Sequence, residues 1–165
     1  MAYTAALVKA AYPDAVRVFI GPCIAKKHEG LSNPDVDYVL MYSELAALFA
    51  GKGIKVEECP ADAVMDLRPA TPIGRGFPVH SGVADAIIAG VKGAVDVNPV
   101  FIDGLTRQNV KLLNAYAKKC PGNLVEVMSC EGGCVGGPGV INQPQAAARL
   151  IAEFIIHAEG QLGKE

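Results

Sequence analysis

The chain has 165 residues, a hydrophobic fraction of 51% and a formal net charge of −2. These values predict a globular protein with its own core and exclude a disordered chain. Without a basic run, binding to nucleic acid or to an anionic membrane surface is not expected. The sequence contains no apolar stretch long enough to span a membrane and no signal-peptide pattern at its start. We therefore expect a single domain over residues 1–165, located in the cytoplasm, where disulfides are uncommon.

Helical and strand patterns alternate along the chain. In chain order we expect a helix over 3–12, strands over 16–20 and 36–41, a helix over 44–50, an irregular proline-rich stretch over 59–77, a helix over 81–91, a strand over 95–102, a helix over 106–119, a strand over 124–128 and a helix over 144–159. Ser43, Ser81 and Thr106 are the expected N-caps. This alternation, with short connections, predicts an α/β fold with a largely parallel β-sheet flanked by helices.

A cysteine follows directly after the first predicted strand. Gly21 and Pro22 end that strand, Cys23 comes next, and Lys26 and Glu29 follow at fixed offsets. The lysine could donate to an anionic ligand, and the glutamate could pair with the lysine or relay a proton. The alternative is a strand-to-loop junction with a solvated Lys/Glu surface, and the spacing alone favours it.

Two further cysteines follow the last predicted strand. Cys130 and Cys134 lie in a stretch that also holds five glycines, up to Gly139. Glycines let a backbone approach a bound group, and the loop N–H groups could donate to an anion such as an iron–sulfur cluster with thiolate ligands. The alternative is a glycine-rich turn with two inert thiols. Because ligands bind beyond the carboxyl ends of parallel strands, we expect Cys23 and Cys130 to converge on one sheet edge.

The two stretches together resemble active-site motifs of the iron-only hydrogenases. The form Pro-Cys-x-x-Lys-x-x-Glu is matched by Pro22, Cys23, Lys26 and Glu29. The form Glu-x-Met-Ala-Cys-x-x-Gly-Cys-x-x-Gly-Gly is matched by Glu126, Met128, Cys130, Gly133, Cys134, Gly136 and Gly137, with Ser129 in place of Ala. Residues 76–83 look like the Phe-bearing loop of the family. The similarity covers roughly residues 16–140. This region resembles the latter half of the family's catalytic domain, which forms one lobe of that domain.

The resemblance implies the H-cluster, in which a 4Fe–4S cubane is joined through a cysteine thiolate to a two-iron unit with carbon monoxide, cyanide and a dithiolate. The implied metal ligands are Cys23 and Cys130 on the cubane and Cys134 as the bridge. The implied catalytic residues are Lys26, which would hydrogen-bond a cyanide, Glu29, and Met128, which would pack beside the two-iron unit. The implied cofactor-binding residues are Pro22, Phe77, Gly133, Gly136 and Gly137.

The implied activity is the reversible conversion of protons and electrons to H₂, with a redox partner such as ferredoxin. The family's first cysteine motif has no counterpart here, Gly21 replaces a Met, and Gly137-Pro138-Gly139 replaces the usual ending. We therefore expect the C-terminal portion of a catalytic domain, inactive alone and without a loaded cofactor when made in an ordinary host. It should bind the missing N-terminal half or self-associate. A hydrogen- or redox-sensing module and a non-catalytic iron–sulfur scaffold stay open as alternatives.

The remaining metal-binding side chains match no motif. Cys59 and Cys120 could replace the missing ligand only as a minor alternative. We expect the three histidines to be structural or solvated, with His28 and His80 in loops and His157 on the closing helix.

Overall fold

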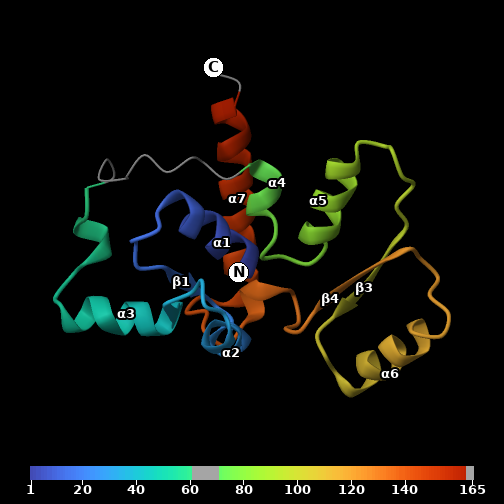
Figure 1. Cartoon of the computed structure of the whole chain (residues 1–165), viewed down its shortest axis with the longest axis horizontal. Helices are drawn as coiled ribbons and strands as arrows, with labels where there is room; N and C mark the ends of the chain where they lie inside the picture. Colours follow the sequence, from blue (N-terminus) through green and yellow to red (C-terminus); the bar gives the residue numbers. More distant parts are fainter. Residues whose placement is uncertain (61–70, 163–165) are drawn as a thin grey trace. The chain divides into compact units, whose positions relative to one another are not determined.

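The strands pair in parallel, as predicted, in a computed structural model that describes residues 1–60 and 71–162, with side chains up to residue 156. The chain divides into two units. Figure 1 labels the helices and strands along the chain. The first unit is Met1–Asp66 with Gly137–Ile141, and the second is Leu67–Gly136 with Asn142–Glu165. Most of the irregular stretch expected over 59–77 lies outside the described residues.

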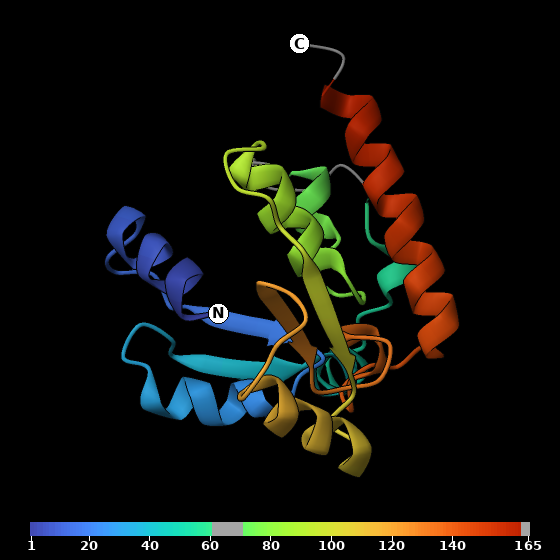
Figure 2. The same cartoon turned by 90° about the vertical axis from the view of Figure 1, so that its right-hand side faces the viewer.

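The first unit is built on one pair of strands. Its elements are α1 (Ala2–Ala11), β1 (Val18–Gly21), α2 (Ala25–Ser32), β2 (Tyr38–Met41), α3 (Tyr42–Gly51) and the short 3₁₀ helix η1 (Val56–Glu58). β1 and β2 run side by side, from Val18 beside Tyr38 to Gly21 beside Met41 (Figure 2). Among the described residues of this unit, Val36 and Ala5 are the buried apolar side chains.

Helix α2 corrects the prediction that Cys23 opens a loop, and it places His28 on a helix. Its sequence is polar, without an apolar stripe, so its periodicity gave no helical signal. Packing against β2 supports it instead. A Cβ atom on Gly30 would lie 2.5 Å from Cγ2 of Val39, so only glycine allows this close approach. Here tertiary packing overrides the low helix propensity of glycine.

The start of α3 differs from the expected Ser43 cap. The cap position is Met41, whose N–H donates to Oε2 of Glu44 at 2.8 Å. Ser43 lies inside the helix, and its N–H donates to the carbonyl of Gly139. The glutamate at the third helical position therefore satisfies the orphan amide of the cap residue itself, which is the N3 half of a capping box.

The second unit contains the other strand pair. Its elements are α4 (Pro72–Arg75), α5 (Gly82–Val91), β3 (Pro99–Asp103), α6 (Arg107–Tyr116), β4 (Leu124–Met128), the 3₁₀ turn η2 (Cys134–Gly136) and α7 (Pro144–Leu162). β3 and β4 are parallel from Pro99 beside Leu124 to Asp103 beside Met128. The Thr106 cap is confirmed by the N–H of Asn109, which donates to its hydroxyl at 3.2 Å.

The α/β class is confirmed, but the strands of the described residues form two separate pairs instead of one sheet. The strand before Cys23 lies in one pair and the strand before Cys130 in the other. The core of the second unit includes Ile102, which is 1% exposed, with Ala84 and Met128. The apolar runs predicted each strand, while the pairing partner depends on contacts far along the chain.

Two glycines of α5 give a matched test of this packing. A Cβ on Gly82 would lie 1.9 Å from the carbonyl oxygen of Gly76, whereas a Cβ on Gly90 would meet nothing within 4 Å. We expect Gly82→Ala to lower the free energy of unfolding by about 1–3 kcal/mol through overpacking. Gly90→Ala should raise it by about 0.5–1 kcal/mol because alanine favours the helix. Urea unfolding followed by circular dichroism measures both, and equal effects would contradict the described contact.

Candidate functional site

The first thiol stretch joins β1 to α2 within the first unit. Cys23 is half-buried, and its carbonyl accepts the N–H of Lys26 at 3.2 Å as the helix begins. The carbonyl of Pro22 accepts the N–H of Gly139 at 2.9 Å. The glycine segment that follows the second thiol stretch in sequence is therefore hydrogen-bonded to the residue that precedes Cys23.

Lys26 and Glu29 form an ion pair on α2. Nζ of Lys26 lies 2.5 Å from Oε2 of Glu29, and the N–H of Ala2 donates to Oε1 at 3.3 Å. The hydrogen bond from Lys26 is the main cause that lowers the pKa of Glu29 below its ordinary value of 4.5. Their spacing of three residues places the two side chains on one helix face. The pairing that the sequence suggested is thus present, and Lys26 is engaged by a carboxylate.

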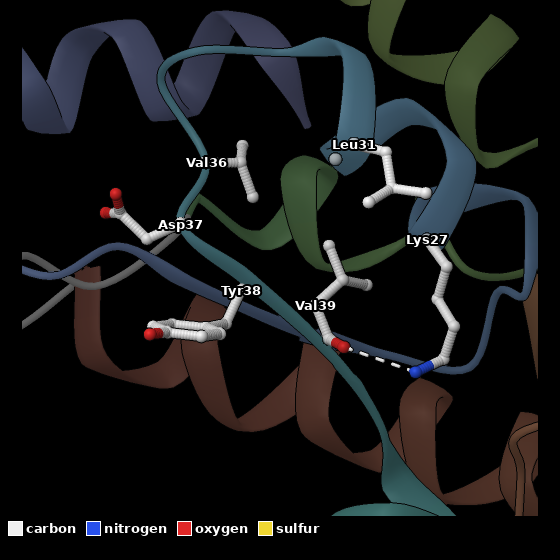
Figure 3. Close-up of a pocket in the computed structure, with 7 residues that line it drawn as sticks. Lys27, Leu31, Val36, Asp37, Tyr38 and Val39 are labelled. Carbon is white, nitrogen blue, oxygen red and sulfur yellow. Dashed lines mark hydrogen bonds between the residues drawn. The ribbon is translucent and has the colours of Figure 1, made fainter.

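A second lysine on α2 borders a hollow of about 310 Å³ in the first unit (Figure 3). Nζ of Lys27 donates to the carbonyl of Val39 at 3.4 Å and lies 2.8 Å from Oε2 of Glu44. The other lining residues are Gly30, Leu31, Val36, Asp37 and Tyr38. The residues that line this hollow include no cysteine and none of the predicted site residues, so we assign it no part in the candidate site.

The second thiol stretch forms a tight loop after β4. Met128 is the last residue of that strand and is buried. Gly132 and Gly133 have φ of +78° and +88°, a region that side chains other than glycine disfavour. The N–H of Gly133 donates to the carbonyl of Cys130 at 3.1 Å. The segment Cys130–Cys134, which we call the thiol loop, therefore has a defined shape with two half-buried thiols.

The amide groups of the thiol loop, and those of Val135 and Gly136 directly after it, differ from what the sequence predicts. We expected them to point at an anionic partner, but protein oxygens already accept several of them. Oδ1 of Asp103 accepts the N–H of Gly132 at 2.7 Å. The carbonyl of Gly133 accepts the N–H of Gly136 at 3.1 Å, and that of Pro78 accepts the N–H of Val135 at 3.2 Å. These groups stabilise the loop itself.

Close backbone approaches explain two of the predicted cofactor-binding glycines. A Cβ on Gly133 would lie 2.7 Å from the carbonyl oxygen of Pro78, and one on Gly136 would lie 2.2 Å from that of Glu131. Gly137 is the first residue of the chain's return to the first unit. A hollow of about 540 Å³ adjoins the loop and is lined by Glu131, Gly132, Val135, Gly136, Pro144, Gln145 and Ala148.

Sequence reasoning missed the role of two carboxylates beside this loop. Asp103 bonds the loop directly, and Glu126 is only 7% exposed, with its oxygens accepting the N–H groups of Ser81 and Ala84. Glu126 was noted only as a motif match. The signal that could have identified it is a charged residue at an inward position of an otherwise apolar strand, which requires buried partners.

The other predicted side chains lie outside both thiol stretches in sequence. Phe77 is 46% exposed in the turn before α5, and Cys59 is exposed, with its thiol donating to the carbonyl of Lys55. His80 lies in a turn as predicted, and its ring packs 5.1 Å from that of Phe101. Cys120 is half-buried. The side chain of His157 lies outside the described part, although its backbone belongs to α7 as predicted.

The donor set fits an iron–sulfur cofactor in its chemistry. None of the five cysteines, all within the described residues, forms a disulfide, and thiolates are the usual ligands of such clusters. Among the described residues, no three His, Cys, Asp or Glu side chains gather into a metal-binding group. Cys130 and Cys134 belong to one unit and Cys23 to the other, so a common site for all three stays a prediction.

The two adjacent lysines of α2 allow a matched test of the site's electrostatics. Lys26→Met should raise the pKa of Glu29 toward 4.5 and leave the pKa of Glu44 unchanged. Lys27→Met should do the reverse, because the hydrogen bond from Lys27 is the main cause that lowers the pKa of Glu44. Carboxyl chemical shifts followed by NMR during a pH titration report each pKa separately.

The sign of the effect on stability follows from these shifts. A carboxyl whose pKa is lower in the folded state contributes stability above its unfolded pKa and loses that contribution as the pH falls through its folded value. The stability lost by the wild type below pH 4.5 should therefore be smaller in Lys26→Met. An unchanged Glu29 titration in this variant would contradict the described ion pair.

The chain is similar to proteins of known class. The family model described as iron only hydrogenase large subunit, C-terminal domain, matches residues 1–138. The periplasmic Fe hydrogenase large subunit of Nitratidesulfovibrio vulgaris is 29% identical over 160 residues, which cover 74% of this chain and 38% of that protein. The NADP-reducing hydrogenase subunit HndD of Solidesulfovibrio fructosivorans is 31% identical over 160 residues, and this match covers 75% of this chain and 27% of that protein.

These relatives are considerably longer than the matched region, since the chain spans 38% and 27% of their lengths. One of them is periplasmic by name, so the expected cytoplasmic location stays a prediction. In the described residues, no helix combines the length and apolarity needed to cross a bilayer. The family match extends through both thiol stretches and covers most of the chain. The chain therefore belongs to the family of the iron-only hydrogenase large subunit, C-terminal domain.

Proposed function

We propose that this chain supplies part of a hydrogen-activating site, in an oxidoreductase that interconverts protons and electrons with H₂. The observation that carries the proposal is the family match over residues 1–138, which includes Cys23, Cys130 and Cys134 in their two motifs. Membership of the family implies an iron–sulfur cofactor. The tight thiol loop supports this assignment, because it offers two thiols of one short segment in a fixed shape.

In this proposal the three cysteines would hold the H-cluster, Cys23 and Cys130 as ligands of its cubane and Cys134 as the bridging ligand. When bound, the cofactor supplies the redox chemistry, and the protein supplies ligation and polar contacts. Met128, buried at the end of β4, and Phe77 contribute apolar surface. Lys26, whose ammonium Glu29 orients, contributes a hydrogen-bond donor. Pro22, Gly133, Gly136 and Gly137 let the backbone approach the cofactor closely.

The electrons require a redox partner, for which we propose a ferredoxin. The remaining part of the catalytic domain is the second proposed partner. The relatives are much longer than the matched region, which supports this idea. The chain alone is therefore expected to evolve no hydrogen, even after treatment with the family's maturation proteins.

Iron loading tests the ligand assignment. After anaerobic reconstitution with iron and sulfide, we expect the wild-type chain to bind iron. Cys23→Ser, Cys130→Ser and Cys134→Ser should each weaken iron binding by at least about tenfold, since loss of a ligand is no milder than loss of a supporting contact. The matched controls Cys59→Ser and Cys120→Ser should bind as the wild type does. Iron and acid-labile sulfide content measure this.

Two results would contradict the assignment. One is equal iron loss in the control variants, and the other is a wild-type chain that binds no iron. Hydrogen evolution by the chain alone at the rate of a full-length hydrogenase would contradict the need for a partner segment. Hydrogen evolution only after addition of the rest of the domain would support it. Iron loading without hydrogen evolution in either case would favour the sensing or scaffold alternatives.

Exposed apolar side chains generate a further expectation about association. Tyr3 and Leu7 on α1 are 90% and 72% exposed and lie four residues apart, on one helix face. Clustered exposed apolar groups commonly mark interfaces. We expect the isolated chain to self-associate with rising concentration, and Tyr3→Ser/Leu7→Ser to reduce this. Light scattering measures the mass, with Asn114→Ser on α6 as the control. A monomer at every concentration would contradict the expectation.

A further inference from the structure

The buried carboxylate of Glu126 has no assigned part in the proposed function. Glu126 lies in the middle of β4 and is 7% exposed. Its Oε1 accepts the N–H of Ser81 at 2.8 Å, and its Oε2 accepts the N–H of Ala84 at 2.7 Å. A buried charge is costly unless it is hydrogen-bonded, and here each oxygen has a backbone donor.

The two donors belong to the N-terminus of α5, which lies beside β4 (Figure 2). The cap residue Ser81 has φ of +72°, and its hydroxyl bonds Asp85 at 3.0 Å, so it does not cap the helix itself. Glu126 takes over that function from a strand 45 residues away in sequence. The positive end of the helix dipole favours a carboxylate at this place.

The turn that precedes α5 also contacts the thiol loop. Val79 forms an antiparallel bridge with Gly133, and the carbonyl of Pro78 accepts the N–H of Val135 at 3.2 Å. Gly133 and Val135 are the two neighbours of Cys134 in sequence. The backbone of residues 78–81 is therefore hydrogen-bonded to Glu126 at one end and to both neighbours of Cys134 at the other.

We propose that Glu126 is a positioning residue for the thiol loop. Its carboxylate fixes the turn 78–81, and that turn fixes the backbone on both sides of Cys134. The printed partners of its two oxygens are the amides of Ser81 and Ala84, so in this proposal Glu126 acts on the loop through the turn. The relevance of this positioning rests on the proposed function, in which Cys130 and Cys134 are cofactor ligands. Asp103 acts on the same loop independently, through the N–H of Gly132.

Glu126→Gln is the first test, because it keeps the shape and removes the charge. We expect amide hydrogen exchange to rise about tenfold both in residues 77–84 and in residues 130–136, the factor for loss of a buried hydrogen bond to a charged group. Alkylation rates of Cys130 and Cys134, resolved by mass spectrometry, should rise with it. Rates at Cys59 and Cys120 should not change. The control Glu131→Gln removes an exposed charge of the same loop and should change neither measurement.

Asp103→Ala separates the two carboxylates. It should raise exchange in residues 130–136 and leave residues 77–84 unchanged, because it acts on the loop without passing through the turn. The proposal is overturned if Glu126→Gln raises exchange only near α5, or if all five cysteines react faster together. The first result would mean that Glu126 caps a helix and nothing more, and the second that its loss unfolds the unit.

A measurement on the wild type keeps the proposal testable if Glu126→Gln does not fold. Native-state hydrogen exchange at low denaturant gives a free energy of opening for each amide. For the amides of Ser81, Ala84, Gly133 and Val135, these free energies should converge to one value as the denaturant concentration rises, because the four amides open together. Separate openings of the two pairs would overturn the coupling.

Iron loading distinguishes failure of this inference from failure of the proposed function. If Glu126 positions the ligands, Glu126→Gln should weaken iron binding by about tenfold while the cysteines remain present. A wild type that binds no iron would refute the ligand role but leave the coupling measured by exchange intact. Normal iron binding in Glu126→Gln, despite a loosened loop, would overturn the positioning role.

Discussion

The second unit depends on one buried carboxylate. Glu126 occupies an inward position of β4, where an apolar residue would ordinarily lie. Moving an ionised carboxylate out of water costs several kcal/mol unless hydrogen bonds replace its hydration. The amides of Ser81 and Ala84 supply those bonds, and the carboxylate in turn satisfies two orphan donors of α5. Strand, helix and turn therefore stabilise one another, and none of the three can shift without leaving a buried polar group unpaired.

The same principle governs the polar groups of both thiol stretches. Lys26 is paired with Glu29, and the amides of Gly132 and Val135 are bonded to Asp103 and to the Pro78 carbonyl. The protein thus fixes the shape of the thiol loop by its own hydrogen bonds. A loop of this kind offers thiols in a prepared arrangement, so less ordering is needed when a ligand binds. Its bonded amides, however, are poor candidates for donors to a cluster, and such contacts would have to come from other groups.

The sequence predicted features that are encoded locally. The apolar run at β4, the Thr106 cap and the cysteine motifs depend on neighbouring residues, and the first two of these features are confirmed. Features that depend on distant contacts were missed. Helix α2 lacks an apolar stripe and relies on the close approach of Gly30 to Val39, and Ser81 leaves its capping function to Glu126. The inward position of Glu126 on an apolar strand indicates that it needs buried partners, but those partners are amides 45 and 42 residues away in sequence, so they could not be predicted.

The chain passes from one unit to the other shortly after the thiol loop, between Gly136 and Gly137. Gly136 closes η2 in the second unit, and Gly137 begins the segment that belongs to the first. That segment is bonded inside the first unit, because Gly139 donates to the carbonyl of Pro22 and accepts the N–H of Ser43. A Cβ on Gly139 would lie 2.8 Å from the Cβ of Met41, so a larger residue would disturb the packing of this segment in the first unit. The glycines after Cys134 therefore serve two purposes, since Gly136 permits a tight turn and Gly139 a close attachment beside the residue that precedes Cys23.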